Sequence, residues 1–146
     1  MRIESVTAAG LEDWVALRQQ LWPCYEAEHR AEAGAALENP DAEAFLARDD
    51  SGRAIGFAEA TLRRDYVNGC TTSPAGFLEG IYVQESHRHR GVARLLCRAA
   101  EDWARTHGCS EMASDALLDN SASHRMHGAL GFSETERVVY FRKPLK

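Results

Sequence analysis

A basic turn between two apolar segments carries the clearest chemistry in the sequence. The turn reads Arg88-His89-Arg90-Gly91-Val92-Ala93; an apolar segment, 77–84, precedes it, and apolar residues at helical spacing follow it as far as Trp103. Gly91 and Ala93 leave room for a ligand to approach the backbone, and a helix that begins here directs unpaired N–H groups at the same point. The turn is therefore expected to bind an anion, most naturally a phosphate; a solvated Arg-rich turn is the alternative.

Apolar periodicity and turn signals predict the elements that position this turn. Strands are expected over residues 1–6, 42–48, 54–62, 77–84, 112–115 and 135–142, and helices over residues 11–21, 25–37, 92–107 and 119–131, with Thr7 as the cap of the first helix. The sequence Asp49-Asp50-Ser51-Gly52 predicts a hairpin. A long helical link allows segments 77–84 and 112–115 to pair in parallel beside an otherwise antiparallel sheet. One mixed α/β domain over residues 1–146 is expected.

Composition excludes several classes of protein. No run approaches the roughly 18 apolar residues of a membrane span, and the first residues lack the apolar core of a signal peptide, so a cytoplasmic protein is expected. The net charge of −5 disfavours a nucleic-acid binder and fits a cationic partner. The four cysteines lack C-x-x-C spacing and are expected to be buried or incidental thiols, with a disulfide or metal role as the alternative. The six histidines complete no recognisable ligand set, so no metal is expected.

The spacing Arg88-x-x-Gly91-x-Ala93, after a strand and before a helix, resembles the pyrophosphate loop of the GCN5-related N-acetyltransferase (GNAT) superfamily. It lacks the glycines of the dinucleotide fingerprint and the Gly-Lys-Ser/Thr ending of the P-loop. A second stretch, Asn120-x-x-Ser123-x-x-x-His127-x-x-x-Gly131-Phe132, is similar to another pattern of that family, which often has Tyr where His127 stands. Segments 21–23, 77–83, 112–115 and 134–143 most resemble the bacterial aminoglycoside 6'-N-acetyltransferases of the family.

The resemblance implies the GNAT fold: a mixed, mostly antiparallel central sheet with flanking helices and one parallel strand pair splayed for acetyl-CoA. A β-bulge near Tyr82 would splay that pair. The pyrophosphate is expected to contact Arg88, His89, Arg90, Gly91, Val92 and Ala93, mainly through main-chain N–H groups. The pantetheine arm is expected to contact Ile81, Tyr82, Val83 and Asn120. Helix capping alone is the alternative for Asn120.

Acetyl transfer from a thioester to an amine, the chemistry of this family, needs a proton acceptor, a stabilised oxyanion and a route for the leaving thiolate. Glu79 is the first candidate for the base and Asp115 the second. The alternative for either carboxylate is that it only anchors a cationic substrate by its charge. The backbone N–H of Val83 or a neighbour is expected to polarise the thioester carbonyl. His127 is a candidate proton donor to the thiolate, with a structural role as the alternative.

An aminoglycoside carries several ammonium groups and little apolar surface, so its site is expected to be wide, lined with carboxylates and flanked by aromatic rings. The candidate substrate contacts are Trp22, Tyr25, Glu26, Tyr66, Glu79, Asp115 and Glu136. Core packing is the alternative for Trp22 and Tyr25, and an ordinary solvent-facing position is the alternative for Glu136. The resemblance also implies a homodimer, in which the region of Glu136 would reach the partner's cleft.

The expected function is acetyl-CoA-dependent N-acetylation of an aminoglycoside antibiotic by direct attack, at the 6' amine, which confers resistance to the drug. One alternative keeps the chemistry and changes the acceptor to a polyamine, another small amine or a protein amino group. The other alternative is a non-catalytic acyl-CoA-binding module. Thiol release from acetyl-CoA in the presence of amines distinguishes an enzyme from such a module.

Overall fold

A five-stranded sheet supplies most of the framework, and its strands lie side by side in sequence order. The computed structural model describes residues 1–146, and the strands are β1 (Arg2–Ser5), β2 (Ala42–Arg48), β3 (Ala54–Arg63), β4 (Ala75–Val83) and β5 (Met112–Ser114). Neighbouring strands from β1 to β4 are antiparallel, and β4 pairs with β5 in parallel. The predicted mixed α/β fold with one parallel strand pair is confirmed.

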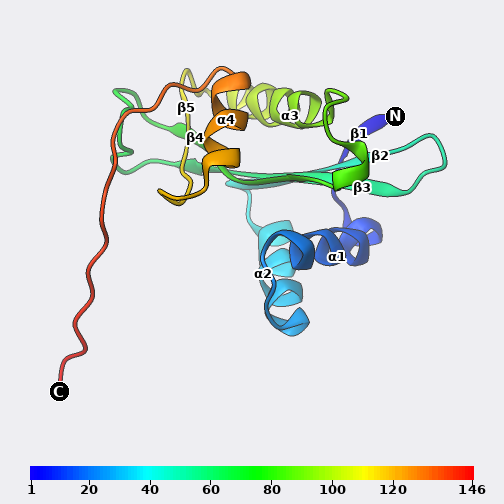
Figure 1. Ribbon diagram of the computed structural model, residues 1–146, viewed down its shortest axis with the longest axis horizontal. Helices are drawn as coiled ribbons and strands as arrows, with labels where there is room; N and C mark the ends of the chain where they lie inside the picture. Colours follow the sequence, from blue (N-terminus) through cyan, green and yellow to red (C-terminus); the bar gives the residue numbers. More distant parts are fainter. The chain divides into compact units, whose positions relative to one another are not determined.

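The chain divides into two units, residues 1–115 and residues 116–146, and each is described by itself. In the first unit, helices cover both faces of the sheet (Figure 1). The helices α1 (Leu11–Leu21) and α2 (Glu26–Glu38) lie on one face, and α3 (Val92–Thr106) lies on the other. A single domain over residues 1–146 stays a prediction.

The start of α1 differs from the prediction. Thr7 makes no side-chain cap hydrogen bond, so the predicted cap is wrong. A short 3-10 turn, η1 (Ala8–Gly10), comes first, and Gly10 rather than Thr7 precedes the first residue of α1. The hydroxyl of Thr7 therefore lies too early in the chain to satisfy the first N–H groups of the helix.

The hairpin between β2 and β3 forms where the turn signal predicts it. The carboxylate of Asp49 accepts hydrogen bonds from the N–H groups of Ser51 and Arg53, both at 2.9 Å. Gly52 takes a φ of 85°, a left-handed value that Gly adopts at little cost. These contacts fix the register in which Leu46 faces Phe57 across the two strands.

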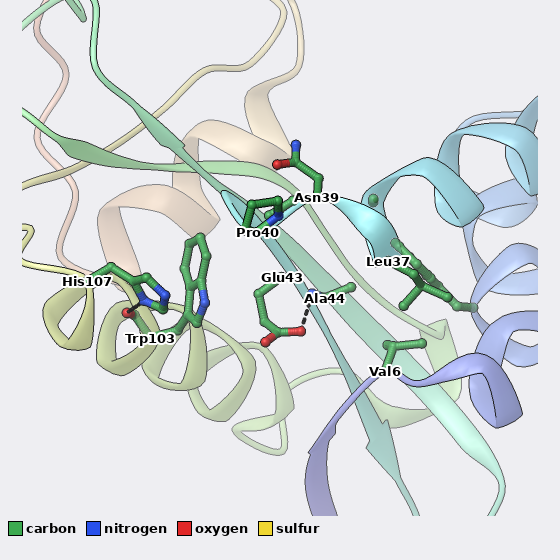
Figure 2. Close-up of a pocket in the computed structure, with 11 residues that line it drawn as sticks. Val6, Leu37, Asn39, Pro40, Glu43, Ala44, Trp103 and His107 are labelled. Atoms are coloured by element: carbon green, nitrogen blue, oxygen red, sulfur yellow. Dashed lines mark hydrogen bonds between the residues drawn. The ribbon is translucent and has the colours of Figure 1, made fainter.

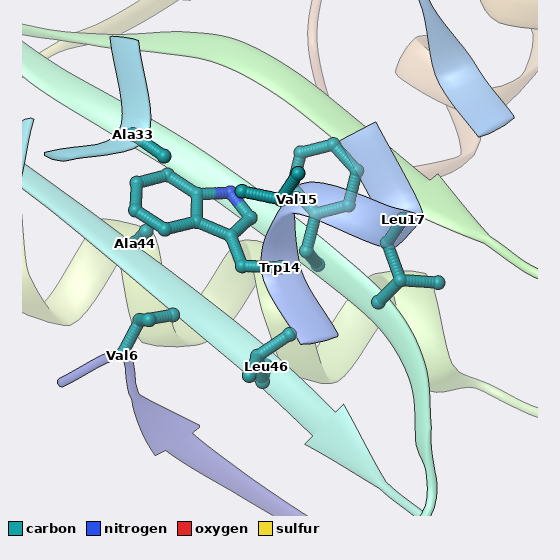
Figure 3. Packing of buried hydrophobic residues seen from close by; sticks show 8 residues of the cluster. Val6, Trp14, Val15, Leu17, Ala33, Ala44 and Leu46 are labelled. Atoms are coloured by element: carbon teal, nitrogen blue, oxygen red, sulfur yellow. The ribbon is translucent and has the colours of Figure 1, made fainter. Parts of the chain in front are cut away.

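Apolar side chains fasten α1 to the sheet. Trp14, Val15 and Leu17 of α1 pack with Leu46 of β2 and Phe57 of β3, and all are buried (Figure 3). Burial of apolar surface contributes roughly 25 cal/mol for each Å² removed from water, so side chains of this size stabilise the contact by several kcal/mol together. The end of α1 therefore has a defined position against the sheet.

The second unit contains one helix and an extended segment. The helix α4 (Ser121–Ala129) begins after Asn120, whose side chain accepts a hydrogen bond from the N–H of Ser123 at 3.1 Å. Residues 132–146 follow without helix or strand (Figure 1). The predicted strand over residues 135–142 is therefore wrong for a single chain, because no strand of the five-stranded sheet pairs with it.

The structure also bears on the cysteines, on metal binding and on membrane spans. All four cysteines are free thiols. No group of three or more His, Cys, Asp or Glu side chains is placed to hold a metal ion. None of the helices has the length and apolar content that crossing a bilayer requires.

Candidate active site

The parallel pairing of β4 with β5 stops partway along β4. The last pair joins Leu78 to Ser114, although β4 continues to Val83. The N–H group of Gln84 donates to the carbonyl oxygen of Ile55 in β3 at 2.9 Å. Backbone groups of successive residues in a strand point to opposite sides, so those of Val83 point away from β3. The carbonyl oxygen of Val83 accepts instead from Nε of Arg88 at 2.8 Å. Beyond Leu78, β4 therefore has an open edge, where another extended group can pair.

A bulge in β4 marks the place where this opening begins. Neighbouring residues of β3 face Leu78 and Gly80, so Glu79 is an extra residue between them. The predicted bulge near Tyr82 is wrong, because Tyr82 keeps a regular pair with Phe57. A bulge bends its strand and increases the local twist, which turns β4 away from β5 where their pairing ends.

The side chain of Glu79 is held by two donors from β3. Its Oε1 atom accepts from the Thr61 hydroxyl at 2.7 Å and from Nη2 of Arg63 at 2.8 Å. The guanidinium of Arg63 lies over the Phe77 ring, 3.5 Å from its centre, which limits its own movement. Oε2 makes no hydrogen bond within the protein. Glu79 thus presents an oriented carboxylate oxygen that can accept a proton or bind a cation.

Asp115 comes into the same region from the neighbouring strand. It follows Ser114, which is the partner of Leu78 in the last parallel pair, and Glu79 follows Leu78 on β4. The hydroxyl of Ser114 also donates to the carbonyl oxygen of Leu78 at 3.1 Å, which reinforces the end of the pairing. The side chain of Asp115 is exposed. Glu79 and Asp115, the two carboxylates that the sequence indicates, therefore both lie next to the point where β4 and β5 separate.

The basic turn contains a row of unpaired N–H groups. After a 3-10 turn, η2 (Glu85–His87), the backbone takes left-handed φ values of 62° at His89 and 81° at Gly91. The first backbone hydrogen bond of α3 runs from the N–H of Leu95 to the carbonyl oxygen of Gly91 at 3.1 Å. The N–H groups from His89 to Ala93 donate no hydrogen bond within the protein. Such a row at a helix N-terminus is suited to bind an anion.

Arg88 connects this turn to β4. Its N–H donates to the carbonyl oxygen of Glu85 at 3.2 Å, and its Nε donates to that of Val83. Its guanidinium carbon lies 5.7 Å from the centre of the Tyr82 ring. Arg88 therefore braces the turn against β4, and its Nη atoms rather than its N–H group are left for contact with an anion.

Trp22 lies against β4 on the face that carries Glu79. A Cβ atom placed on Gly80 would lie only 2.3 Å from the Trp22 ring, so the indole occupies the space of a side chain. The ring also meets Phe57 edge-on, with centroids 5.9 Å apart. Phe57 and Thr61 alternate onto one face of β3, and Thr61 binds Glu79, so the indole and the carboxylate share that face.

The other candidates of the first unit lie at the surface. Tyr25 is 79% exposed, so the core interpretation of this ring is wrong, whereas Trp22 is partly buried against the core. Glu26, in the first turn of α2, accepts from Arg30 at 3.1 Å. Tyr66 is 83% exposed and lines a hollow of about 190 Å³ in its own loop, 64–73.

The second unit holds the remaining candidates. Nδ1 of His127 lies 2.7 Å from the carbonyl oxygen of Ser123, and its ring meets Phe132 edge-on at 5.3 Å. The carbonyl oxygen accepts only, so Nδ1 carries the proton, and Nε2 can donate a proton only from the imidazolium form. Asn120 caps α4, and Glu136 lies in the extended segment. Their roles at the site stay predictions.

A profile of the acetyltransferase (GNAT) family matches residues 14–132. The chain belongs to that family. Among its relatives, the aminoglycoside N(6')-acetyltransferase type 1 of Acinetobacter haemolyticus is 51% identical over 145 residues and covers 99% of both chains. The protein of the same name from Serratia marcescens is 52% identical over 137 residues, which are 93% of this chain and 94% of that one. Family membership therefore rests on nearly the whole length of the chain.

Solved structures of the family agree with this assignment. The crystal structure of the aminoglycoside antibiotic 6'-N-acetyltransferase AAC(6')-IG from Acinetobacter haemolyticus, without ligand, matches with a TM-score of 0.95 over 100% of both chains at 51% identity. AAC(6')-Iy in complex with the bisubstrate analogue CoA-S-monomethyl-acetylneamine matches with a TM-score of 0.94 at 47% identity, over 99% of this chain and 98% of that one. The GNAT fold is thereby confirmed.

One hollow of this GNAT chain lies apart from the candidate residues. It has a volume of about 310 Å³ between the end of α2, the start of β2 and the last turn of α3 (Figure 2). Its polar lining comes from Asn39, Glu43, Trp103 and His107. None of the candidate site residues lines this hollow, so it contributes nothing to the site on β4.

Several residues that shape the site were missed from the sequence. Thr61 and Arg63 hold Glu79, and Gly80 makes room for Trp22, yet none of them belongs to a family motif. A signal was present at Glu59, a lone carboxylate in the apolar strand segment 54–62. Burial raises the pKa of Glu59, and Arg18 opposes that shift. A buried carboxylate requires hydrogen-bond or ion-pair partners, and the polar residues of the first helices could have been searched for them.

Proposed function

We propose that the protein is an aminoglycoside 6'-N-acetyltransferase that transfers the acetyl group of acetyl-CoA to the 6' amine and so confers resistance to the antibiotic. The observation that carries this proposal is the match to AAC(6')-Iy, whose bisubstrate analogue joins CoA to an acetylated neamine. The names of the relatives from Acinetobacter haemolyticus and Serratia marcescens support the same substrate. The net charge of −5 fits a polycationic substrate.

In this proposal, acetyl-CoA is a substrate that binds along β4 and the basic turn. The diphosphate binds the N–H groups of His89, Arg90, Gly91, Val92 and Ala93 together with the side chain of Arg88. The left-handed backbone at Gly91 and the unpaired N–H groups of the turn fit a diphosphate. The pantetheine arm pairs with Ile81, Tyr82 and Val83 at the open edge of β4, and Asn120 contributes a hydrogen bond.

The reaction in this proposal is a direct attack of the amine on the thioester carbonyl. Glu79 takes a proton from the ammonium group, directly or through a water, and so frees the nitrogen lone pair. The N–H of Val83 stabilises the oxyanion while the new C–N bond forms and the C–S bond breaks. The thiolate then receives a proton from His127 in its imidazolium form, and the nitrogen of the new amide loses its second proton to water. Asp115 anchors a second ammonium group or replaces Glu79 as the base.

The acceptor site of this proposal combines stacking surfaces with carboxylates. Trp22 forms its inner wall, since its ring lies on β4 beside the bulge that carries Glu79. The remaining contacts come from Tyr25, Glu26, Tyr66 and Glu136. The exposure of Tyr25 and Tyr66 leaves both rings available to stack on sugar faces.

We also propose that the working enzyme is a homodimer. The extended segment 132–146 leaves large apolar side chains in water: Tyr140 is 86% exposed and Phe141 is 93% exposed. Exposed apolar side chains that follow one another in the chain are typical of an interaction surface, which a second copy can cover. Sedimentation of the full chain is expected to give a dimer, and removal of residues 133–146 is expected to give a monomer. A full chain that stays monomeric at all concentrations would contradict the dimer.

The proposal places the enzyme in the cytoplasm as one domain over residues 1–146. The four free cysteines support a reducing compartment, because thiols of secreted proteins usually become oxidised. The profile match over residues 14–132 runs through both units, which supports one functional domain.

Gly91→Ala is expected to raise the KM for acetyl-CoA several-fold, with a smaller change in the KM for the aminoglycoside. A non-Gly residue at a φ of 81° costs about 1–2 kcal/mol, so the turn relaxes and its N–H groups lose their alignment. Gly52→Ala is the matched control, because Gly52 has a φ of 85° and equally open surroundings in the hairpin turn. Steady-state kinetics with varied acetyl-CoA measures the effect. An equal KM in the two variants would contradict the diphosphate role of the turn.

Thiol release from acetyl-CoA tests the proposed function itself. A kanamycin-type substrate with a 6' amine is expected to release thiol, and an analogue with a 6' hydroxyl is expected to release none. Thiol release only with a polyamine, another small amine or a peptide would identify the alternative acceptors. Tight CoA binding without thiol release for any amine would identify a non-catalytic module.

A further inference from the structure

The segment that carries Trp22 is tied to a partly buried polar cluster, which has no place in the reaction proposed above. The polar cluster consists of Trp14, Arg18, His29, Glu32 and Glu59. Arg18 and His29 are the only polar or charged residues among the buried ones, with 5% and 2% of their surface exposed. Burial of such groups costs free energy unless each finds partners, so their contacts identify what they hold in place.

His29 uses both ring nitrogens, and one of them binds the main chain of Trp22. Nδ1 accepts from Nε–H of Arg18 at 3.1 Å, and Nε2 lies 2.7 Å from the carbonyl oxygen of Trp22. Because an Arg nitrogen only donates and a carbonyl oxygen only accepts, His29 is neutral with its proton on Nε2. The Sγ atom of Cys24 also lies 3.0 Å from Nε2. His29 therefore fixes the segment that links α1 to α2 at Trp22.

Arg18 contacts the same segment. Its guanidinium donates to Glu59 and to Glu32, and it lies 5.1 Å from the centre of the Trp22 ring. Trp14 Nε1–H donates to Glu59 at 2.9 Å, and thereby completes the cluster. The N–H of Trp22 donates to the carbonyl oxygen of Arg18 at 2.8 Å. The main chain and the ring of Trp22 are thus both held by the polar cluster.

We infer that His29 is a positioning residue of the acceptor site, which sets the place of the Trp22 ring on β4. The ring fits over Gly80 with no space to spare, so a small shift of its main chain moves it out of the acceptor wall. His29 touches no substrate and acts through Trp22. This inference rests on the proposed function, because it concerns the wall that Trp22 contributes to the aminoglycoside site.

Three replacements of His29 separate positioning from folding. His29→Gln keeps a donor near the place of Nε2 and is expected to stay within about twofold of the parent KM. His29→Asn retains an acceptor near the place of Nδ1 but is too short to reach Trp22, and His29→Leu keeps only the volume. Both are expected to raise the KM for the aminoglycoside about three- to tenfold, which corresponds to the net loss of one hydrogen bond. The KM for acetyl-CoA is expected to stay within about twofold.

A double-mutant cycle with Trp22→Ala tests whether His29 acts through the ring. In the Trp22→Ala background, His29→Asn is expected to cause no further rise in the KM for the aminoglycoside. The same rise in both backgrounds would overturn the inference. Equal kinetics of His29→Gln and His29→Asn would overturn it as well. So would an unchanged KM for the aminoglycoside in a His29→Asn variant that still melts cooperatively.

Fluorine NMR of protein labelled with 5-fluorotryptophan gives a test that needs no substrate. Trp22→Phe assigns the Trp22 signal, and the signal of Trp103, which lies on α3, is the internal reference. His29→Asn is expected to shift or broaden the Trp22 signal, while His29→Gln is expected to leave it near its original position. An unchanged Trp22 signal in His29→Asn would refute positioning. If no aminoglycoside is acetylated, the proposed function fails, and this measurement still decides whether His29 places Trp22.

Discussion

Glu79→Gln is expected to lower the turnover of acetyl transfer by about 10²-fold or more, the range for loss of a general base. The variant keeps the shape of the side chain, and its amide oxygen can still accept from Thr61 and Arg63, which hold Oε1 in the structure. It loses the carboxylate oxygen that makes no hydrogen bond within the protein. The KM for acetyl-CoA is expected to change little. Steady-state kinetics with both substrates varied separates these quantities.

Glu43→Gln is the matched control for this prediction. Glu43 is a half-buried glutamate on β2 that lines the hollow away from the site, so its replacement is expected to leave turnover unchanged. If Glu79 only anchors a cationic acceptor, Glu79→Gln raises the KM for the aminoglycoside and leaves kcat near the parent value. That result would remove Glu79 from proton transfer, and Asp115→Asn would then be the next variant to measure.

Gly80→Ala is expected to lower kcat/KM for the aminoglycoside by about tenfold or more and to lower the melting temperature. The new Cβ atom would lie 2.3 Å from Cη2 and 2.6 Å from Cζ2 of Trp22, so the indole has to leave its place on β4. Displacement of a packed side chain of this size costs about 1–3 kcal/mol. A loss of 1.4 kcal/mol in transition-state binding corresponds to about a tenfold loss in rate.

Gly34→Ala makes the same chemical change without the clash. Gly34 lies within α2, and a Cβ atom there meets nothing within 4 Å. That variant is expected to keep full activity and to gain about 0.5–1 kcal/mol of stability, because Ala favours the helix. Kinetics and thermal melting of the two variants together measure the effect of the contact with Trp22. Equal activity in both would show that the ring has no fixed role at the site.

The parts of the fold that depend on local sequence were predictable. The hairpin follows from the Asp49–Gly52 turn, whose backbone hydrogen bonds are local, and α3 follows from its apolar spacing and from Gly91 and Gly108 at its ends. The segment 135–142 alternates like a strand, but a strand forms only where another strand offers backbone partners. Its sequence says nothing about whether such a partner lies within the same chain.

The sequence motifs of the candidate site were predictable, but the contacts between its residues and the position of the bulge were not. The turn around Gly91 and the carboxylate of Glu79 are recognisable because their residue types carry the chemistry. The bulge lies at Glu79 rather than near Tyr82, because its place depends on the register between β3 and β4. The contact of Trp22 with Gly80 joins residues far apart in the chain, and no local sequence pattern predicts it.

A crystal structure of the protein with CoA would show where the diphosphate and the pantetheine arm bind. The diphosphate is expected within hydrogen-bond distance of the N–H groups of residues 89–93. The pantetheine arm is expected along the open edge of β4, with its sulfur beside the bulge at Glu79. CoA bound elsewhere, for example in the hollow beside Glu43 and Trp103, would contradict the account.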